Sequence, residues 1–263
     1  MPRPLTHASL FTGLGAFDLA AEWLGWPTVF QVEQNPFCLN VLTRHFPHAH
    51  RHSDIRTFDA TPYAGTVDVL TGGFPCQSFS LAGKGQMDLT LWRQMLRCVV
   101  ACRPAWVVAE NVRGLLARSH GLVLEEICAD LENAGYSVFP PLLLPAAAAD
   151  ADHRRERLWL VAHTRSQRQP QQHPAPVPEE PEPGPILLHS LVPAQPQLRP
   201  RYASLRDVLR EANGLSEGLD SATRNAALYA LGNSIHPVIA FNILRSIAYI
   251  QCRTLPKTAL NYP

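Results

Sequence analysis

Residues 9–20 have the sequence "SLFTGLGAFDLA", and this stretch decides the fold. A strand is expected over 8–11, and a turn containing Gly13 and Gly15 leads into a helix expected over 16–24. Glycines at such a turn let the backbone approach a ligand, and the helix start offers unpaired N–H groups. The pattern predicts a site for a nucleoside-containing cofactor, with an ordinary strand-to-helix turn as the alternative.

The next predicted strand supports this interpretation. It covers 28–33 and ends at Glu33, and dinucleotide-binding folds place an acid there that bonds ribose hydroxyls. Asp54 could end a third strand and meet an adenine amino group. Taken alone, however, Asp54 is better interpreted as a turn or helix-capping residue.

Outward from this turn, short apolar runs alternate with helical patterns. This alternation predicts an α/β fold, with a mainly parallel sheet and helices on both faces. Gly135 is expected to cap the C-terminus of one helix. The remaining strands are expected over 67–73, 105–112 and 157–162, and the remaining helices over 36–46, 91–102, 122–136, 203–212 and 236–250.

Composition limits the class of protein. The chain has 263 residues, of which 46% are hydrophobic, and a formal net charge of +1. A sizeable core is therefore expected, and any nucleic-acid footprint must be local. Six cysteines without a CxxC pair predict reduced thiols. No signal peptide or membrane-length apolar run is evident, so we expect a cytoplasmic protein without membrane contact.

A proline-rich stretch interrupts the pattern. Residues 167–200 contain ten of the 24 prolines, which favours extended chain over a regular core. We therefore predict a catalytic and cofactor-binding domain over 1–163, a small proline-rich region over 164–215, and a C-terminal return over 216–263 that completes the first domain.

Cys76 lies in the second informative stretch, residues 71–80, "TGGFPCQSFS". It follows a predicted parallel strand, and ligands bind in the crevice at that end of open α/β sheets. A thiol with a pKa of about 8.5 needs help from a helix start or nearby cations to act as a nucleophile. Most free cysteines are instead buried and inert, so position alone leaves both interpretations open.

Polar side chains lie at one end of each of two further predicted strands. Glu110 and Asn111 end the strand over 105–112, where partial desolvation should raise the pKa of the glutamate and favour its protonated form. Arg155 and Arg157 begin the strand after 152 and should point to one side, as paired forks for phosphate or carbonyl oxygens. The alternatives are that Glu110 pairs structurally with an arginine, and that Arg155 and Arg157 belong to a solvated, charged strand end.

Together these motifs resemble the cytosine-C5 DNA methyltransferase family, most of all its short phage and bacterial members. The matching segments are "SLFTGLGAFDLA", "GGFPCQSFS", "ENV", "RRERLWLVA" and "LGNSIHP", which occur in the family's order over about residues 8–163 and 228–250. The resemblance implies a Rossmann-like S-adenosylmethionine-dependent methyltransferase fold, with 164–215 as a reduced target-recognition region. Ser9 departs from the family pattern, since many members carry Asp there.

The resemblance also implies a mechanism. Cys76 would add to C6 of a flipped cytosine, which activates C5 to attack the methyl sulfonium. Glu110 would contact N3 and supply a proton, Arg157 would lie near O2, and Arg155 would order the site. Asn111 would brace the catalytic loop. The implied loop residues that contact or close over DNA are Pro75, Gln77, Ser78 and Ser80, and Arg165 is a candidate phosphate contact.

For the cofactor, the resemblance implies S-adenosylmethionine and no metal. Glu33 would bind its ribose hydroxyls, and Asp54 and Ile55 would meet its adenine. The other implied cofactor contacts are Phe11, Gly13, Gly15, Leu91, Asn233 and Ser234.

The family resemblance implies double-stranded DNA as substrate, a restriction endonuclease as a candidate partner, and a monomer. Two other functions stay open: a cofactor- and DNA-binding protein without efficient turnover, and an RNA cytosine-C5 methyltransferase. The histidines at 45, 48, 50 and 52 have spacing that resembles a zinc cluster but lack cysteine partners, so packing is the expected role.

Overall fold

Eight strands form one sheet in the computed structural model, which describes residues 3–75, 88–149, 155–165 and 221–253. The strand order is β3-β2-β1-β4-β5-β8-β6, and β7 also pairs with β8. Strands β3, β2, β1, β4 and β5, which are neighbours in the sheet in this order, are parallel. Strand β8 is antiparallel to β5, β6 and β7. Their bounds are β1 His7–Leu10, β2 Thr28–Val32, β3 His50–His52, β4 Val69–Gly73, β5 Trp106–Val112, β6 Tyr136–Val138, β7 Leu142–Pro145 and β8 Glu156–Thr164.

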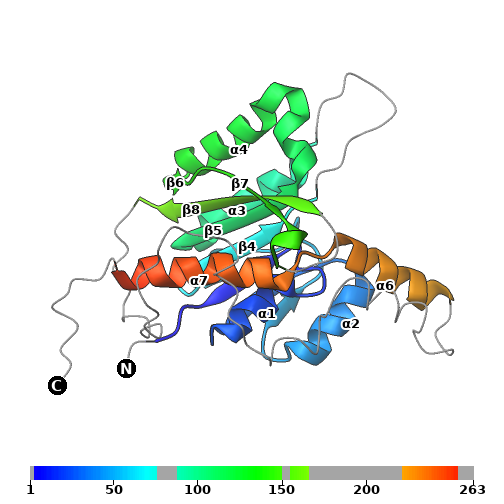
Figure 1. The fold of residues 1–263 in the computed structure, drawn as a ribbon. Coiled ribbons are helices and arrows are strands. Elements are labelled where there is room, and N and C mark those ends of the chain that lie inside the picture. The colour runs from blue at the N-terminus through cyan, green and yellow to red at the C-terminus, as the bar shows by residue number, and fades with distance from the viewer. Residues whose placement is uncertain (1–2, 76–87, 150–154, 166–220, 254–263) are drawn as a thin grey trace.

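Helices cover both faces of this sheet (Figure 1). Helices α1 and α7 lie side by side on one face of the sheet, and α3 and α4 lie on the other. Helix α6 packs on α2. The predicted α/β architecture is therefore confirmed. The helix bounds are α1 Ala16–Trp23, α2 Pro36–His45, α3 Thr90–Cys102, α4 Leu122–Asn133, α6 Ser221–Asn233 and α7 Pro237–Arg253, with short 3-10 segments η1 Thr61–Tyr63, η2 Arg113–Gly121 and η3 Ala146–Ala149.

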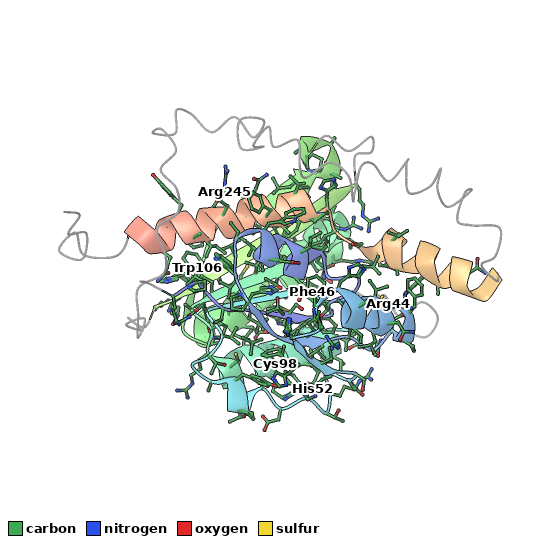
Figure 2. The ribbon with its side chains drawn as sticks, turned by 90° about the horizontal axis from the view of Figure 1, so that it is seen from below. Arg44, Phe46, His52, Cys98, Trp106 and Arg245 are labelled. Carbon is green, nitrogen blue, oxygen red and sulfur yellow. The ribbon has the colours of Figure 1, made fainter. Side chains whose placement is uncertain are left out.

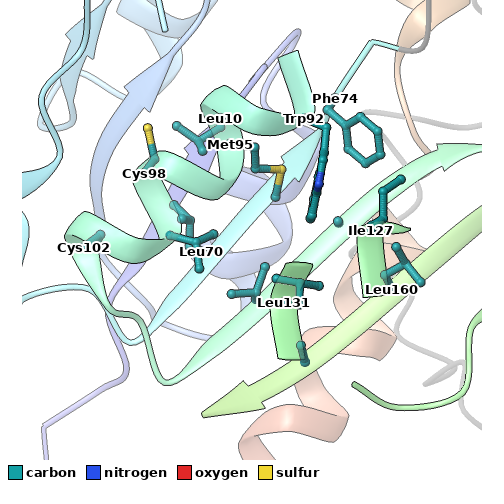
Figure 3. Packing of buried hydrophobic residues seen from close by; sticks show 14 of the residues in the cluster. Leu10, Leu70, Phe74, Trp92, Met95, Cys98, Cys102, Ile127, Leu131 and Leu160 are labelled. Atoms are coloured by element: carbon teal, nitrogen blue, oxygen red, sulfur yellow. The ribbon is translucent and has the colours of Figure 1, made fainter. Parts of the chain in front are cut away.

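Helix α3 supplies one of the two cores. Its buried face carries Trp92, Met95, Cys98 and Cys102, each with an exposed fraction of 0%. Figure 3 shows this face turned toward side chains of the sheet and of α4. Both cysteines and Trp92 therefore serve packing. Burial of such side chains contributes about 1.5–3 kcal/mol each.

The second core lies under α1 and α7. Trp106 and Trp159 pack there against both helices, and the Trp106 indole Nε1 donates to Gln251 Oε1 at 3.0 Å. Figure 2 shows Trp106 beside α7. Helix α7 thus packs into the same core as helix α1 of the N-terminal half.

Local signals explain several element boundaries. The Asn35 side chain caps α2 by accepting from the backbone N–H groups of Phe37 and Cys38, and Pro36 occupies the first helical turn. Gly135 has a φ of 92° just after α4, which is the left-handed conformation expected of a glycine at a helix end. Helix α4 itself ends at Asn133, before the predicted 136.

The described chain adds elements that the apolar pattern did not predict. Strands β6 and β7 are short, and β6 opens directly after the glycine that ends α4, where the sequence favoured helix to residue 136. Helix α6, which contacts α2, has little amphipathic pattern. The helix expected over 203–212 and most of the 164–215 region lie outside the described residues.

Candidate active site

A cavity of about 540 Å³ opens at the carboxyl ends of the parallel strands. Most residues that the sequence analysis assigned to cofactor or substrate line it, although they come from distant parts of the chain. These residues are Phe11, Gly13, Glu33, Asp54, Ile55, Pro75, Leu91, Glu110, Asn111, Arg157 and Asn233.

The glycine turn after β1 is tied to the acid after β2. Glu33 Oε2 accepts from Gly13 N at 2.7 Å, and Oε1 accepts from Asn35 N at 2.7 Å. Phe11 and Gly13 have φ values of 52° and 58°, and a left-handed phenylalanine is uncommon and costs free energy. The two loops are therefore fixed to each other, with a carboxylate that keeps acceptor capacity toward the cavity.

A buried polar network lies beneath this turn. Asp18 Oδ1 accepts from Ser9 Oγ and from Gln31 Nε2, both at 2.9 Å, and Ser9 Oγ lies 2.9 Å from Thr12 Oγ1. Burial raises the pKa of Asp18 to about 6. Helix α1 thus places a buried carboxyl group next to Ser9.

The segment after β3 forms another wall. Asp54 Oδ1 accepts from Arg56 N at 2.9 Å, which makes the local turn expected of a lone aspartate, yet Asp54 also lines the cavity. Ile55 is buried, and Leu91 faces the same cavity from the start of α3. The local turn at Asp54 is therefore observed, and its contact with adenine stays a prediction.

Glu110 is the most perturbed acid of the cavity. It ends β5 with an exposed fraction of 7%, and Arg157 Nε lies 2.9 Å from its Oε1. No hydrogen bond of good geometry reaches Oε1 within the described chain, so the contact is an ion pair that leaves lone pairs unused. Burial raises the pKa of Glu110 to about 7, and the charges of Arg157 and Arg155 oppose that rise.

The pKa of Glu110 follows the direction predicted from its place at the strand end. At neutral pH the carboxyl group is divided between its two protonation states. The group can therefore donate a proton to a ring nitrogen and later accept one. The predicted pairing with an arginine also holds, so the structural and the chemical interpretation describe the same residue.

The arginine pair reaches the site because β8 is antiparallel to β5. The start of β8 then lies beside the end of β5, and Arg157 is paired in register with Val112. Arg155 Nη2 donates to the carbonyl of Gly232 at the end of α6. Glu156 points away and pairs with Arg113, as the alternation of strand side chains predicted.

The end of β4 is held close to Glu110. Asn111 Nδ2 donates to the carbonyl of Phe74 at 2.9 Å, which fixes the backbone just before Pro75. A Cβ atom on Gly73 would lie 2.9 Å from Glu110 Oε2, so only glycine gives the carboxyl group its present space. The assigned residues Cys76, Gln77, Ser78 and Ser80 lie outside the described residues.

Among the assigned residues that the structure describes, Gly15, Arg155, Arg165 and Ser234 do not line the cavity. Gly15 has a φ of 83°, and a Cβ there would meet Phe46 at 2.7 Å and Leu42 at 2.9 Å, so it permits close packing of α1 on α2 (Phe46 is labelled in Figure 2). Arg165 follows β8 and lies at the opposite edge of the sheet, where its N–H donates to Gly135 O. Neither residue lines the cavity, and the roles assigned to them stay predictions, since the sequence showed neither the direction of β8 nor the contact of Gly15 with Leu42 and Phe46.

Asn233 is the last residue of α6 and Ser234 follows it, and the two residues lie differently relative to the cavity. Asn233 lines it, whereas Ser234 lies next to it, and the Ser234 hydroxyl donates to Ile235 O at 3.3 Å. Half of the lining residues escaped the sequence analysis. These are Val32, Gln34, Asn35, Cys38, Ser53, Arg56, Gly73, Phe74, Val112, Tyr229 and Ala230. Several of them are sequence neighbours of assigned residues, as Arg56 is of Ile55, and that position is the signal that could have indicated them.

Among the described residues, no three His, Cys, Asp or Glu side chains gather as metal ligands. His50 and His52 instead lie against Tyr63 and Phe58. In the same part of the chain, no helix is long and apolar enough to cross a membrane.

The fold and cavity define an α/β protein with a ligand site at the carboxyl edge of a largely parallel sheet. Solved methyltransferases have the same fold. A Dnmt2 mutant of Spodoptera frugiperda superposes with a TM-score of 0.58, at 14% identity over 93% of this chain and 99% of that chain. A DNA modification methyltransferase from an E. coli prophage gives 0.53, at 23% identity over 61% and 47%.

The family is defined by sequence. Residues 5–225 match the model of the C-5 cytosine-specific DNA methylase, so the chain belongs to that family. It is 39% identical over 162 residues to the Type II methyltransferase M.Eco47II of Escherichia coli, and 35% identical over 164 residues to M.PspPI of Psychrobacter. Each match covers 60% of this chain and 39% of the relative, so the chain matches well under half of these relatives' length.

Proposed function

We propose that the protein is a DNA (cytosine-5-)-methyltransferase that uses S-adenosylmethionine. Membership of the family supports the reaction class. The observation that carries the proposal is the buried Glu110, paired with Arg157 and placed beside the strand end that precedes Cys76. A carboxyl group with a pKa of about 7 can protonate the cytosine ring at N3 near neutral pH.

The cofactor proposal rests on the donors of the cavity. Glu33 offers carboxylate oxygens suited to ribose hydroxyls, and the wall around Ile55 and Leu91 offers an apolar surface for adenine. When bound, S-adenosylmethionine supplies the methyl group. Asn233 is the residue proposed to close over the methionine end, and Gly13 lets the backbone approach the ligand.

The proposed chemistry balances over the residues of the chain. The Cys76 thiolate adds to C6 while Glu110 protonates N3, which makes C5 nucleophilic. After C5 takes the methyl group, a base removes the C5 proton, elimination expels the thiolate, and N3 returns its proton to Glu110, which restores the neutral ring. The cytosine must leave the base stack first, because its C5–C6 bond is shielded within a duplex.

The test is transfer of a labelled methyl group to duplex DNA, with Cys76→Ser as the matched variant. We expect activity in the unchanged protein and its loss in the variant. DNA containing 5-fluorocytosine should trap a covalent adduct only when Cys76 is present. Equal activity of both proteins would refute the covalent mechanism, and methylation of RNA but not DNA would refute the substrate.

Bisulfite sequencing of host DNA after expression would then locate the product. It reports the methylated position and the recognised sequence together. Binding of cofactor and DNA without methylation, under conditions that permit multiple turnovers, would instead favour a binding protein. A restriction endonuclease partner and a monomeric state remain part of the proposal, and the recognised sequence bears on the first.

A further inference from the structure

Arg97 connects helix α3 to the segment that follows β3. Its Nη1 donates to the carbonyl of Phe58 at 2.8 Å, and its Nη2 donates to the carbonyl of Ile55 at 2.5 Å. The remaining Nε donates to Gln94 Oε1 at 2.9 Å, one turn earlier on the same helix. The guanidinium therefore holds two backbone carbonyls while its own orientation is fixed by a neighbour.

The segment that Arg97 holds is a wall of the cavity. Residues 53–56 line it, and their other hydrogen bonds are local. Arg56 N donates to Asp54 Oδ1 at 2.9 Å, and Phe58 N donates to Asp54 O at 3.0 Å. Within the described ranges, the hydrogen bonds that join residues 53–58 to another element all come from Arg97.

Packing alone fixes this segment only in part. The side chains of Ile55 and Phe58 are buried, with exposed fractions of 6% and 2%, so they anchor the two ends of the turn in the core. Contacts of this kind are not directional and permit small rotations of the backbone between the anchors. The planar fork of an arginine fixes two carbonyl directions at once, which a lysine cannot do.

We propose that Arg97 is a positioning residue that sets the adenine-facing wall of the cofactor cavity. The inference rests on the proposed cofactor. Arg97 itself does not line the cavity, whereas Leu91, two turns earlier on α3, does. Helix α3 therefore supplies the wall at Leu91 directly and holds the wall at residues 53–56 through Arg97. The distance between these two walls is thereby kept constant.

The test compares Arg97→Met and Arg97→Lys with the control Arg93→Met. Arg93 lies on the same helix, but its side chain is 67% exposed and makes only a 3.5 Å surface ion pair with Glu126. We expect Arg97→Met to bind S-adenosylmethionine about 10- to 50-fold more weakly, because two charge-assisted hydrogen bonds are lost. Arg97→Lys should lose about 3- to 10-fold, and the control should match the unchanged protein.

Two readouts separate positioning from general stability. The fragment 5′-methylthioadenosine keeps adenine and ribose but lacks the amino-acid end, and its affinity should fall by the same factor as that of the whole cofactor. The rate at saturating cofactor should change less than about threefold, because the methyl-transfer end is untouched. Hydrogen exchange in the cofactor-free protein should quicken at the amides of 56–58 and not in β1 or β5.

The outcomes are distinguishable. Unchanged affinity in Arg97→Met, or exchange that quickens equally throughout the sheet, would overturn the inference. If the unchanged protein fails to bind S-adenosylmethionine, the proposed function fails with its cofactor. The exchange pattern at 56–58 still reports whether Arg97 holds the wall, so the two failures can be told apart.

Discussion

Gly73→Ala should damage catalysis without unfolding the protein. Gly73 is the register partner of Glu110 across β4 and β5. A Cβ atom there would lie 2.9 Å from Glu110 Oε2, closer than carbon and oxygen normally approach. The carboxyl group must therefore shift by a few tenths of an ångström, and the ion pair with Arg157 restricts the directions in which it can move.

The size of the effect follows from the sensitivity of catalytic geometry. Displacements below about 1 Å cost up to about 100-fold in rate, so we expect kcat/KM to fall about 10- to 100-fold. This corresponds to about 1.4–2.7 kcal/mol in the barrier. Gly73 has no positive φ, so alanine fits the backbone, and the lower entropy of the unfolded chain offsets part of the strain.

The matched control is Gly72→Ala on the same strand. Its Cβ would meet Met95 at 3.1 Å and the Leu10 carbonyl at 3.2 Å, so its cost falls on the core. Methyl transfer to duplex DNA and thermal unfolding should be measured for both variants. Gly72→Ala should lose stability and keep kcat/KM within about threefold. A Gly73→Ala enzyme with unchanged kcat/KM would refute the reasoning.

Three further predictions concern titration and packing. Burial raises the pKa of Glu110 in the folded protein to about 7, so the folded protein binds more protons than the unfolded chain between pH 4.5 and 7. The free energy of unfolding should therefore decline as the pH rises from 4.5 to 7, and Glu110→Gln should remove that slope in urea unfolding. The value of kcat/KM should also fall above pH 7. Burial lowers the pKa of His7 in the folded protein to about 3, so below pH 6.5 the unfolded chain binds more protons than the folded protein. The free energy of unfolding should therefore fall by up to about 1.4 kcal/mol for each pH unit below 6.5, and His7→Gln should abolish this dependence. Gly15→Ala should destabilise the fold by about 2–3 kcal/mol in thermal unfolding, because its Cβ meets Phe46 at 2.7 Å and φ is 83°; a loss of cofactor affinity without loss of stability would contradict the packing role.

The sequence predicted the parallel half of the sheet because that half is built from local signals. Strands β1, β2, β4 and β5 are apolar runs followed by a turn and a helix, and the polar residues at their ends meet at one edge. Strand β3, with the sequence HRH, carries no such signal. Glu33, Glu110 and Asn111 are brought to the cavity for this reason. The sequence also predicted the direction of the Glu110 pKa shift from burial alone.

The rest depends on contacts between distant segments. Nothing in the run 157–162 shows that β8 is antiparallel, so the distant position of Arg165 could not be predicted. The packing role of Gly15 depends on Phe46, which follows α2. Arg97 looked like an ordinary charge on a helix, because the carbonyls it binds belong to a different part of the chain.

The reversed direction of β8 has a consequence for how such a protein can vary. Its first residues lie at the catalytic edge and its last residue, Thr164, pairs beside Ala105 at the other edge. The described chain therefore leaves β8 at the edge away from Glu110, and it resumes in α6, whose last residue lines the cavity. A change in the length of the interval between Arg165 and Ser221 leaves the register of β5 and β8 unchanged, and with it the spacing of Glu110 and Arg157.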